Sequence, residues 1–170
     1  MKKSKILFID LDGTLINTIS QKTFPQGIWD MKFNLDVWKK IKQLEPEYVF
    51  IITNQGGIGK FINENEFERK LDYIEVALKS YIKHPLLKEV QSMYCDSNDK
   101  DDPYRKPNIG MIEYFIKTYR LNEKYSIEDI LMVGDSSGKD GDSSDTDLKT
   151  AENANIKYLD INDFLKATFF

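Results

Sequence analysis

The 170-residue sequence contains one cysteine and one histidine, and these shortages exclude several classes of site. Cys95 stands alone, so the chain forms no internal disulfide and builds no multi-cysteine zinc site. We expect it to be a small buried hydrophobe. His84 cannot supply both a catalytic triad and a metal cluster, and it precedes Pro85 in a predicted loop. We therefore expect His84 to have no special role.

Long apolar runs are also missing, since none approaches the roughly 20 residues of a membrane span. The first residues, MKKSKILFIDLDGTL, lack the long apolar region and the cleavage site of a signal peptide, because charges interrupt them. We expect an intracellular protein without a membrane partner. The formal net charge of −4 argues against a broad surface that coats nucleic acid, although a small basic site is compatible with it.

What the sequence does contain is ordinary globular composition, with 41% hydrophobic and 12% aromatic residues. This argues against disorder, and the length suits a single domain, residues 1–170. Short runs rich in β-branched or aromatic residues predict five strands, at residues 5–10, 48–53, 90–95, 130–134 and 156–159. Three of these runs are apolar almost throughout, which is typical of a parallel sheet covered on both faces.

Amphipathic stretches separate the predicted strands. Apolar residues at spacings of three and four mark three helices, around Val37–Leu44, Phe67–Ile82 and Ile112–Tyr119. A fourth helix is expected in DLKTAENA, with Ser144 or Asp145 as its cap. Alternating strands and helices predict an α/β fold, an open parallel sheet of about five strands with helices on both faces.

Ligands of such sheets gather at the carboxyl ends of the strands, so the residues that follow the apolar runs are the first candidates for function. They come from four segments: Asp10 and Asp12, Thr53 and Asn54, Arg105 and Lys106, and Asp135. The carboxylates form an oxygen-rich group that suits Mg²⁺ better than zinc. The plainer alternative for DLDGT is a turn after a strand, but it does not account for the other three segments.

Two acidic segments, residues 96–102 and 135–147, look like solvated loops. The sequence DSSGKDGDSSDTD has some features of a calcium loop, but it lacks the bidentate glutamate and the preceding helix. We therefore do not expect a calcium site here.

The four motifs resemble those of the haloacid dehalogenase (HAD) superfamily of phosphotransferases. More narrowly, DLDGTLINTISQKTFPQGIWD, IITNQGGIGK, YRKPNIGM and ILMVGDSSGK resemble the phosphatase domain of polynucleotide kinase/3′-phosphatase. The likeness continues through DSSDTDLKTAENANIKYLDINDFL and covers nearly the whole chain. YRKPNIGM and the FP-x-G-x-x-D segment at residues 24–30 point to the narrower family.

The resemblance implies a role for each matching residue. Asp10 would be the nucleophile that forms an aspartyl-phosphate, and Asp12 the general acid and base. Thr53 and Lys106 would bind the phosphoryl oxygens. Mg²⁺ would be held by Asp10, the backbone carbonyl of Asp12 and Asp135.

Further residues receive weaker assignments. Asn54, Lys60 and Arg105 are candidates for substrate binding, with exposed surface charge as an equal alternative for the two cations. Asp147 matches an acidic position of the last motif and would orient Lys106 or the metal shell. Asp140 and Asp142 are left without a role.

The expected function is Mg²⁺-dependent removal of 3′-phosphate from DNA ends by a monomeric protein. Residues 13–47 and 56–105 leave no room for a cap domain, so the site would be open to a large substrate. Kinase activity is not expected, because GGIGKF does not complete a Walker A loop. The alternatives are a capless HAD phosphatase for a small metabolite, such as a sugar phosphate or histidinol phosphate, and a silent binding module with the same fold.

Overall fold

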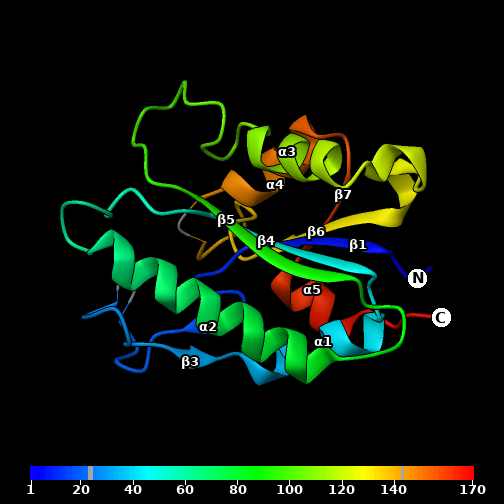
Figure 1. Ribbon diagram of the computed structural model, residues 1–170, viewed down its shortest axis with the longest axis horizontal. Helices are drawn as coiled ribbons and strands as arrows, with labels where there is room; N and C mark the ends of the chain where they lie inside the picture. The colour runs from blue at the N-terminus through cyan, green and yellow to red at the C-terminus, as the bar shows by residue number, and fades with distance from the viewer. Residues whose placement is uncertain (23–24, 143) are drawn as a thin grey trace.

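The computed structural model describes residues 1–22, 25–142 and 144–170 and contains a five-stranded parallel sheet (Figure 1). In spatial order its strands are β5 (Glu89–Cys95), β4 (Tyr48–Asn54), β1 (Ile6–Ile9), β6 (Ile130–Gly134) and β7 (Lys157–Asp160). Each lies within one or two residues of a run predicted from the sequence. The prediction of an open parallel α/β sheet is thereby confirmed.

Helices cover both faces of the sheet (Figure 1). One face packs against α1 (Leu35–Leu44), α2 (Glu64–Ile82) and α5 (Ile161–Lys166). The other packs against α3 (Gly110–Thr118), α4 (Thr146–Asn153) and the 3₁₀ turn η1 (Leu121–Glu123), which is followed by η2 (Ile127–Asp129).

The central strand β1 explains why the apolar runs are continuous. Leu7 and Ile9 belong to the core under α1 and α2, whereas Ile6 and Phe8 belong to the core under α3. All four side chains are fully buried. Successive side chains of a strand point to opposite faces, so a strand covered on both faces must be apolar at every position.

Strand register brings the polar strand ends to one edge. Ile9, the last residue of β1, pairs with Ile51 of β4 and with Val133 of β6. The chain therefore leaves all three central strands within a few residues of the same level. The carboxyl ends of parallel strands form the usual ligand edge of an open sheet.

A small antiparallel ribbon, β2 (Ile16–Asn17) with β3 (Lys32–Phe33), follows β1 and was not anticipated. Trp38 Nε1 of α1 donates to the carbonyl oxygen of Leu15 at 3.0 Å, and the Trp38 and Phe33 rings lie 4.3 Å apart. The ribbon is thus fastened to α1. Phe24 of the FP-x-G-x-x-D segment lies outside the described residues.

The helix starts and ends also follow local chemistry. Asn63 caps α2 by accepting a hydrogen bond from the backbone N–H of Glu66 at 3.2 Å. Asp145 occupies the N-cap position of α4 as expected, but its side chain makes no capping bond and pairs with Lys149 instead. No helix among the described residues is long and apolar enough to cross a membrane.

Candidate active site

A buried lysine lies between two carboxylates at the carboxyl edge of the sheet. Lys106 Nζ is 2.6 Å from Asp10 Oδ1 and 2.7 Å from Asp147 Oδ1. The three residues are only 5%, 7% and 1% exposed, in that order. Burial opposes the charge of Lys106, but the neighbouring Asp10 and Asp147 carboxylates outweigh it and raise the pKa of the lysine. The ammonium group therefore stays charged.

For Asp10, the effect of burial on the pKa is larger than the effect of the neighbouring positive charge. Burial raises the pKa of its carboxyl well above the usual value, and Asp147 adds to this, while the Lys106 ammonium partly compensates. A buried carboxylate is costly unless a positive charge stabilises it. The edge of the sheet thus holds Asp10 in a setting that favours an incoming cation.

Asp147 is positioned from α4 by a close approach to the end of β6. A Cβ placed on Gly134 would lie 2.2 Å from Asp147 Oδ2, so only glycine allows this carboxylate to reach the site. The backbone N–H of Ser136 donates to the same oxygen at 3.2 Å. Asp147 was expected to orient Lys106 or the metal shell; it pairs with Lys106 and also belongs to a group of three carboxylates.

Three carboxylates form a group that could hold a metal ion. Ligand oxygens of Asp10, Asp135 and Asp147 all lie within 4.8 Å of one another. Burial raises the pKa of Asp135 to about 6, and the Asp147 carboxylate adds to this effect. Oxygen-only ligands of this kind suit a hard divalent cation. Gly13 has a φ of +78°, which favours glycine. A Cβ at this position would lie 2.0 Å from Asp135 Oδ2, so glycine also leaves space for that carboxylate.

The second aspartate of DLDGT is held by a residue to which the sequence analysis gave no role. Gln55 Nε2 donates to Asp12 Oδ2 at 2.6 Å and to Thr53 Oγ1 at 3.0 Å. Asp12 is exposed, whereas Thr53 and Gln55 are buried. The TNQ sequence therefore acts as a unit, in which the glutamine joins the candidate general acid to the candidate phosphate-binding threonine.

Asn54 contacts the backbone of the lysine segment. Its Oδ1 accepts from the Lys106 backbone N–H at 2.9 Å, and its Nδ2 donates to the Lys106 carbonyl oxygen at 2.9 Å. The peptide bond between Lys106 and Pro107 is cis. Both polar ends of the Asn54 amide are thus occupied in this structure by the loop that carries Lys106.

The two remaining substrate-binding candidates lie apart from this cluster. Arg105 Nη1 donates to the carbonyl oxygen of Ser97 at 2.6 Å and so fastens the acidic loop at residues 96–102. Lys60 is exposed in the turn that follows TNQ. Asp142 Oδ2 accepts hydrogen bonds from Ser137 and Lys139, which ties the loop after β6 to itself.

Lys70 on α2 is a buried cation that the sequence analysis did not single out. It is 3% exposed, and its Nζ lies 6.0 Å from the centre of the Phe67 ring. Burial lowers the pKa of Lys70, while the charges of Asp12 and Asp30 act against this. A signal was available, because position 70 lies three residues after Phe67 and four before Ile74, on the apolar face of the helix.

Comparison with known proteins agrees with this geometry. The family described as "Polynucleotide kinase 3 phosphatase" matches residues 5–165. The bifunctional polynucleotide phosphatase/kinase of Schizosaccharomyces pombe is 33% identical over 163 residues, which cover 92% of this chain and 36% of that protein. The histidine biosynthesis bifunctional protein HisB of Buchnera aphidicola is 32% identical over 132 residues, covering 72% of this chain and 34% of that protein. The chain spans about a third of each relative.

Among solved structures, the D,D-heptose 1,7-bisphosphate phosphatase of B. bronchiseptica, complexed with magnesium and phosphate, has the same fold. Its TM-score is 0.65 at 19% identity, and the match covers 93% of this chain and 79% of that one. The buried aspartates and the lysine at the sheet edge occur on a fold shared with such phosphatases. With a family match over residues 5–165, the chain belongs to the polynucleotide kinase 3 phosphatase family.

Proposed function

We propose that residues 1–170 form a single Mg²⁺-dependent domain that removes 3′-phosphate from DNA ends. The observation that carries the proposal is the contact between Asp10 and Lys106 at 2.6 Å, inside a group of three carboxylates. Together they provide a nucleophile and a cation at one point of the sheet edge, in a chain that belongs to this phosphatase family.

Asp10 is the proposed nucleophile. A carboxylate oxygen of Asp10 attacks phosphorus, the bond from phosphorus to the 3′ oxygen breaks, and an aspartyl-phosphate forms. Attack of one anion on another needs neighbouring positive charge. Unit charges about 4 Å apart repel by roughly 4 kcal/mol at an effective dielectric constant of about 20. When bound by Asp10, Asp135 and the backbone carbonyl of Asp12 or the carboxylate of Asp147, Mg²⁺ supplies positive charge and orients the phosphoryl group.

Asp12 is the proposed general acid and base. It gives a proton to the departing 3′ oxygen, then takes a proton from the water that hydrolyses the aspartyl-phosphate. Its exposure allows access to both the leaving group and water, while the Gln55 amide fixes its orientation. Thr53 Oγ1 and Lys106 Nζ hold the phosphoryl oxygens as their charge changes.

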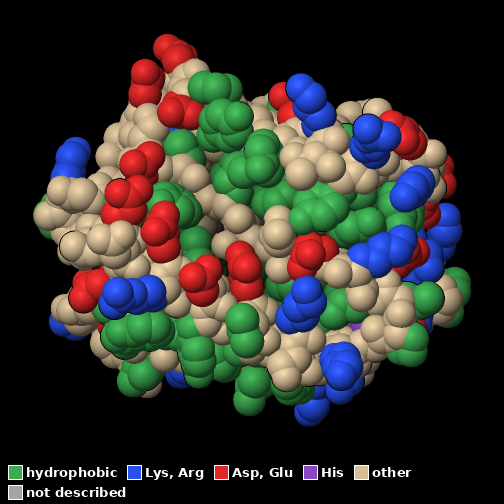
Figure 2. Space-filling view, in the orientation of Figure 1, with side chains coloured by type: hydrophobic (Ala, Val, Ile, Leu, Met, Phe, Trp, Pro, Cys, Tyr) green, Lys and Arg blue, Asp and Glu red, His purple; other side chains and the backbone are tan. Residues whose placement is uncertain are grey.

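An open site suits the end of a polynucleotide. Between β1 and α1, the described residues form only the small β2–β3 ribbon as regular structure. On the face shown in Figure 2, Lys and Arg side chains are scattered among Asp and Glu rather than gathered into one basic surface. We infer contacts to a few nucleotides, with Lys60 and Arg105 near the neighbouring phosphates, in an intracellular monomer without kinase activity.

Phosphate release tests this proposal. The substrates are a 3′-phosphorylated DNA oligonucleotide, its 5′-phosphorylated counterpart, histidinol phosphate and a panel of sugar phosphates, each with Mg²⁺ and with EDTA. We expect metal-dependent release from the 3′ end alone. The matched variant Asp10→Asn should lose turnover, because an amide cannot act as the nucleophile. It should still fold, because Lys106 keeps its ion pair with Asp147.

Other outcomes point to different functions. Faster release from a small phosphate ester would favour metabolite hydrolysis, the alternative that the likeness to HisB supports. Appreciable turnover by Asp10→Asn would remove Asp10 from the nucleophile role. No release from any substrate would favour a silent binding module.

A further inference from the structure

A hollow of about 390 Å³ opens beside the proposed catalytic residues. Asp12, Gly13 and Asp135 form the part of its lining that belongs to the site. Most of the rest comes from one segment of the chain and includes Asn17, Thr18, Gln21, Lys22, Asp30 and Lys32. Its volume falls in the range of about 300–1,000 Å³ that is usual for small-molecule sites.

The hollow lies where the leaving group is expected, if the proposed function is correct. The attacking and leaving oxygens are roughly in line on opposite sides of phosphorus. Asp10 approaches from the buried strand end, whereas Asp12, which protonates the leaving oxygen, lines the hollow. The alcohol that departs therefore faces the wall that the described parts of this segment form, residues 16–22 and 25–32.

Two of the charged side chains of this wall are engaged within the wall itself. The Asp30 carboxylate accepts from the Ser20 backbone N–H at 2.9 Å, from Ser20 Oγ at 2.6 Å and from the Gln26 N–H at 2.8 Å. Lys22 Nζ donates to Gln26 Oε1 at 2.8 Å. These contacts give Asp30 and Lys22 a role in shaping the loop.

Lys32 differs from both. It is exposed, and its ammonium group makes no hydrogen bond or ion pair with any residue in the described part of the chain. An ammonium group in this state is free to bind an anion that enters the hollow. Lys32 is thus the cation of the wall that remains open to a ligand.

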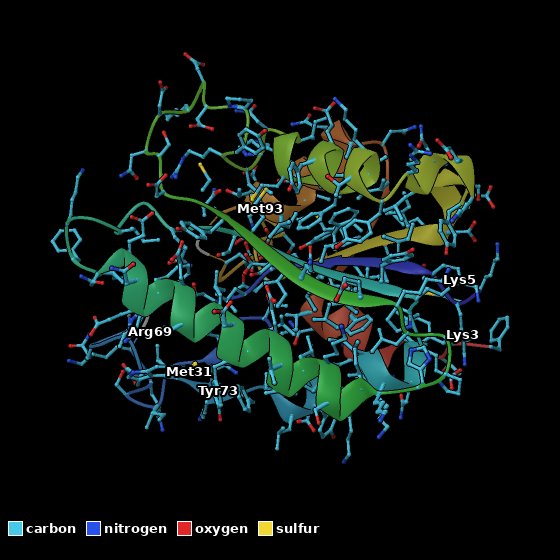
Figure 3. All side chains as sticks on the ribbon, viewed as in Figure 1. Lys3, Lys5, Met31, Arg69, Tyr73 and Met93 are labelled. Atoms are coloured by element: carbon cyan, nitrogen blue, oxygen red, sulfur yellow. The ribbon has the colours of Figure 1, made fainter. Side chains whose placement is uncertain are left out.

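The β2–β3 ribbon directs Lys32 toward the hollow. Phe33, the next residue, packs on α1 and α2, with its ring 4.3 Å from Trp38 and 5.8 Å from Tyr73. Successive residues of a strand point to opposite sides, so Lys32 points away from those helices. Figure 3 shows Met31, Arg69 and Tyr73 on the side where the segment before β3 meets α2, and the Trp29 ring lies 6.0 Å from that of Tyr73. The part of the wall at residues 29–33 is therefore packed against α1 and α2.

We propose that Lys32 binds a second phosphate carried by the leaving alcohol, namely the phosphodiester that joins the terminal nucleotide to the preceding one. A nucleoside 3′-monophosphate has no such group, and neither has a simple sugar phosphate. A lysine ammonium binds phosphate as a strong point charge. Lys32 would then select the end of a polynucleotide over a small ester of the same alcohol.

Three thymidine substrates test this role: thymidine 3′-monophosphate, a 3′-phosphorylated dinucleotide, and the same dinucleotide with an uncharged methylphosphonate linkage. We expect the wild type to have a kcat/KM roughly fivefold higher for the charged than for the uncharged dinucleotide, the upper range for an exposed ion pair. Lys32→Met should reduce this ratio to about one, and Lys32→Arg should restore it. Lys39→Met is the matched control, because Lys39 lies on α1 and lines a different hollow.

The outcomes separate this inference from the proposed function. If the wild type hydrolyses none of the thymidine substrates, the proposed function itself fails. If it hydrolyses them and Lys32→Met keeps the ratio, or loses rate equally on all three, Lys32 does not bind a second phosphate. Fructose 1,6-bisphosphate and fructose 6-phosphate form a second pair of substrates, which differ by a second phosphate on a small sugar. A Lys32-dependent preference confined to that pair would overturn the assignment to a polynucleotide.

Discussion

Lys106 takes part both in buried ion pairs and in the proposed binding of the phosphoryl group. Its Nζ lies 2.6 Å from Asp10 and 2.7 Å from Asp147, and it is the proposed cation for the phosphoryl oxygens. We predict that Lys106→Met lowers kcat by at least about 100-fold, as the loss of an oxyanion donor does. Steady-state phosphate release from a 3′-phosphorylated oligonucleotide measures the effect.

Folding must be followed in the same variant. Removal of one partner from a buried ion pair typically costs about 3–5 kcal/mol, because it leaves the other charge uncompensated. Circular dichroism separates this loss of stability from a loss of catalysis. Lys149→Met serves as the control, because Lys149 forms an exposed pair with Asp145. Near-normal turnover by folded Lys106→Met would mean that Arg105 or another cation performs the task.

Gln55 provides a second prediction at this scale. Its amide holds the Asp12 carboxylate at 2.6 Å, although it touches no proposed reacting atom of the phosphate. Gln55→Leu should lower kcat about tenfold while KM changes little, since a hydrogen bond to a charged group is worth about 1.5–3 kcal/mol. The loss should be smaller with 4-nitrophenyl phosphate, whose leaving group needs less help from a general acid. An equal loss on both substrates would indicate a purely structural role.

The contact between α2 and β5 partly buries the carboxyl group of Glu75, which disfavours its charged form. Glu75 accepts a hydrogen bond from Ser92 Oγ, yet burial dominates and raises the pKa of Glu75. When the pKa of a group is higher in the folded than in the unfolded protein, its protonated form stabilises the fold. This contribution is complete at a pH below the pKa of the unfolded state, and it is lost as the pH rises through the pKa of the folded state. The wild type should therefore lose part of its stability as the pH rises above about 4.

Glu75→Gln removes this dependence while keeping an acceptor for Ser92. We predict that the Tm of the variant, relative to the wild type, rises between pH 4 and pH 8. Ser92→Ala should enlarge the pH dependence of the wild-type residue, because the serine hydroxyl lowers the pKa of Glu75. Thermal melts across this range measure both effects. A difference in Tm that stays constant with pH would contradict the prediction.

The strands were predictable because burial on both faces leaves a continuous apolar run. YVFIIT and ILMVG correspond to β4 and β6 almost residue for residue. The β2–β3 ribbon was missed, because a strand of two residues contains no measurable period. Its existence depends on distant partners such as Trp38, which local sequence does not reveal.

The site was partly predictable, because the ends of the apolar strands can be recognised in the sequence. Strand ends mark Asp10, Thr53 and Asp135, since parallel strands deliver them to one edge. Sequence does not show which polar side chain supports which, so the link from Gln55 to Asp12 had to come from the structure. The exposed Lys32 was equally hidden, because its relevance depends on the direction in which a two-residue strand faces.

Across the whole molecule, the acidic cluster joins segments that are far apart in the chain. Asp10 follows β1, Asp135 follows β6, Asp147 belongs to α4, and Lys106 precedes α3. The three carboxylates outnumber the lysine, so repulsion among them opposes folding in the absence of a metal. A divalent cation bound there would link the ends of β1 and β6 to α4 and stabilise the fold.

Addition of Mg²⁺ should therefore raise the Tm. A ligand that binds only the folded state at 100 times its Kd contributes about 2.7 kcal/mol. For a chain of this size that corresponds to a shift of roughly 5–10 °C. Asp135→Asn should lose most of the shift, whereas Asp101→Asn, in the exposed loop at residues 96–102, should keep it. An undiminished shift in Asp135→Asn would place the metal elsewhere, because a carboxylate that contributes a ligand oxygen and a negative charge cannot be replaced by an amide without weakening the site.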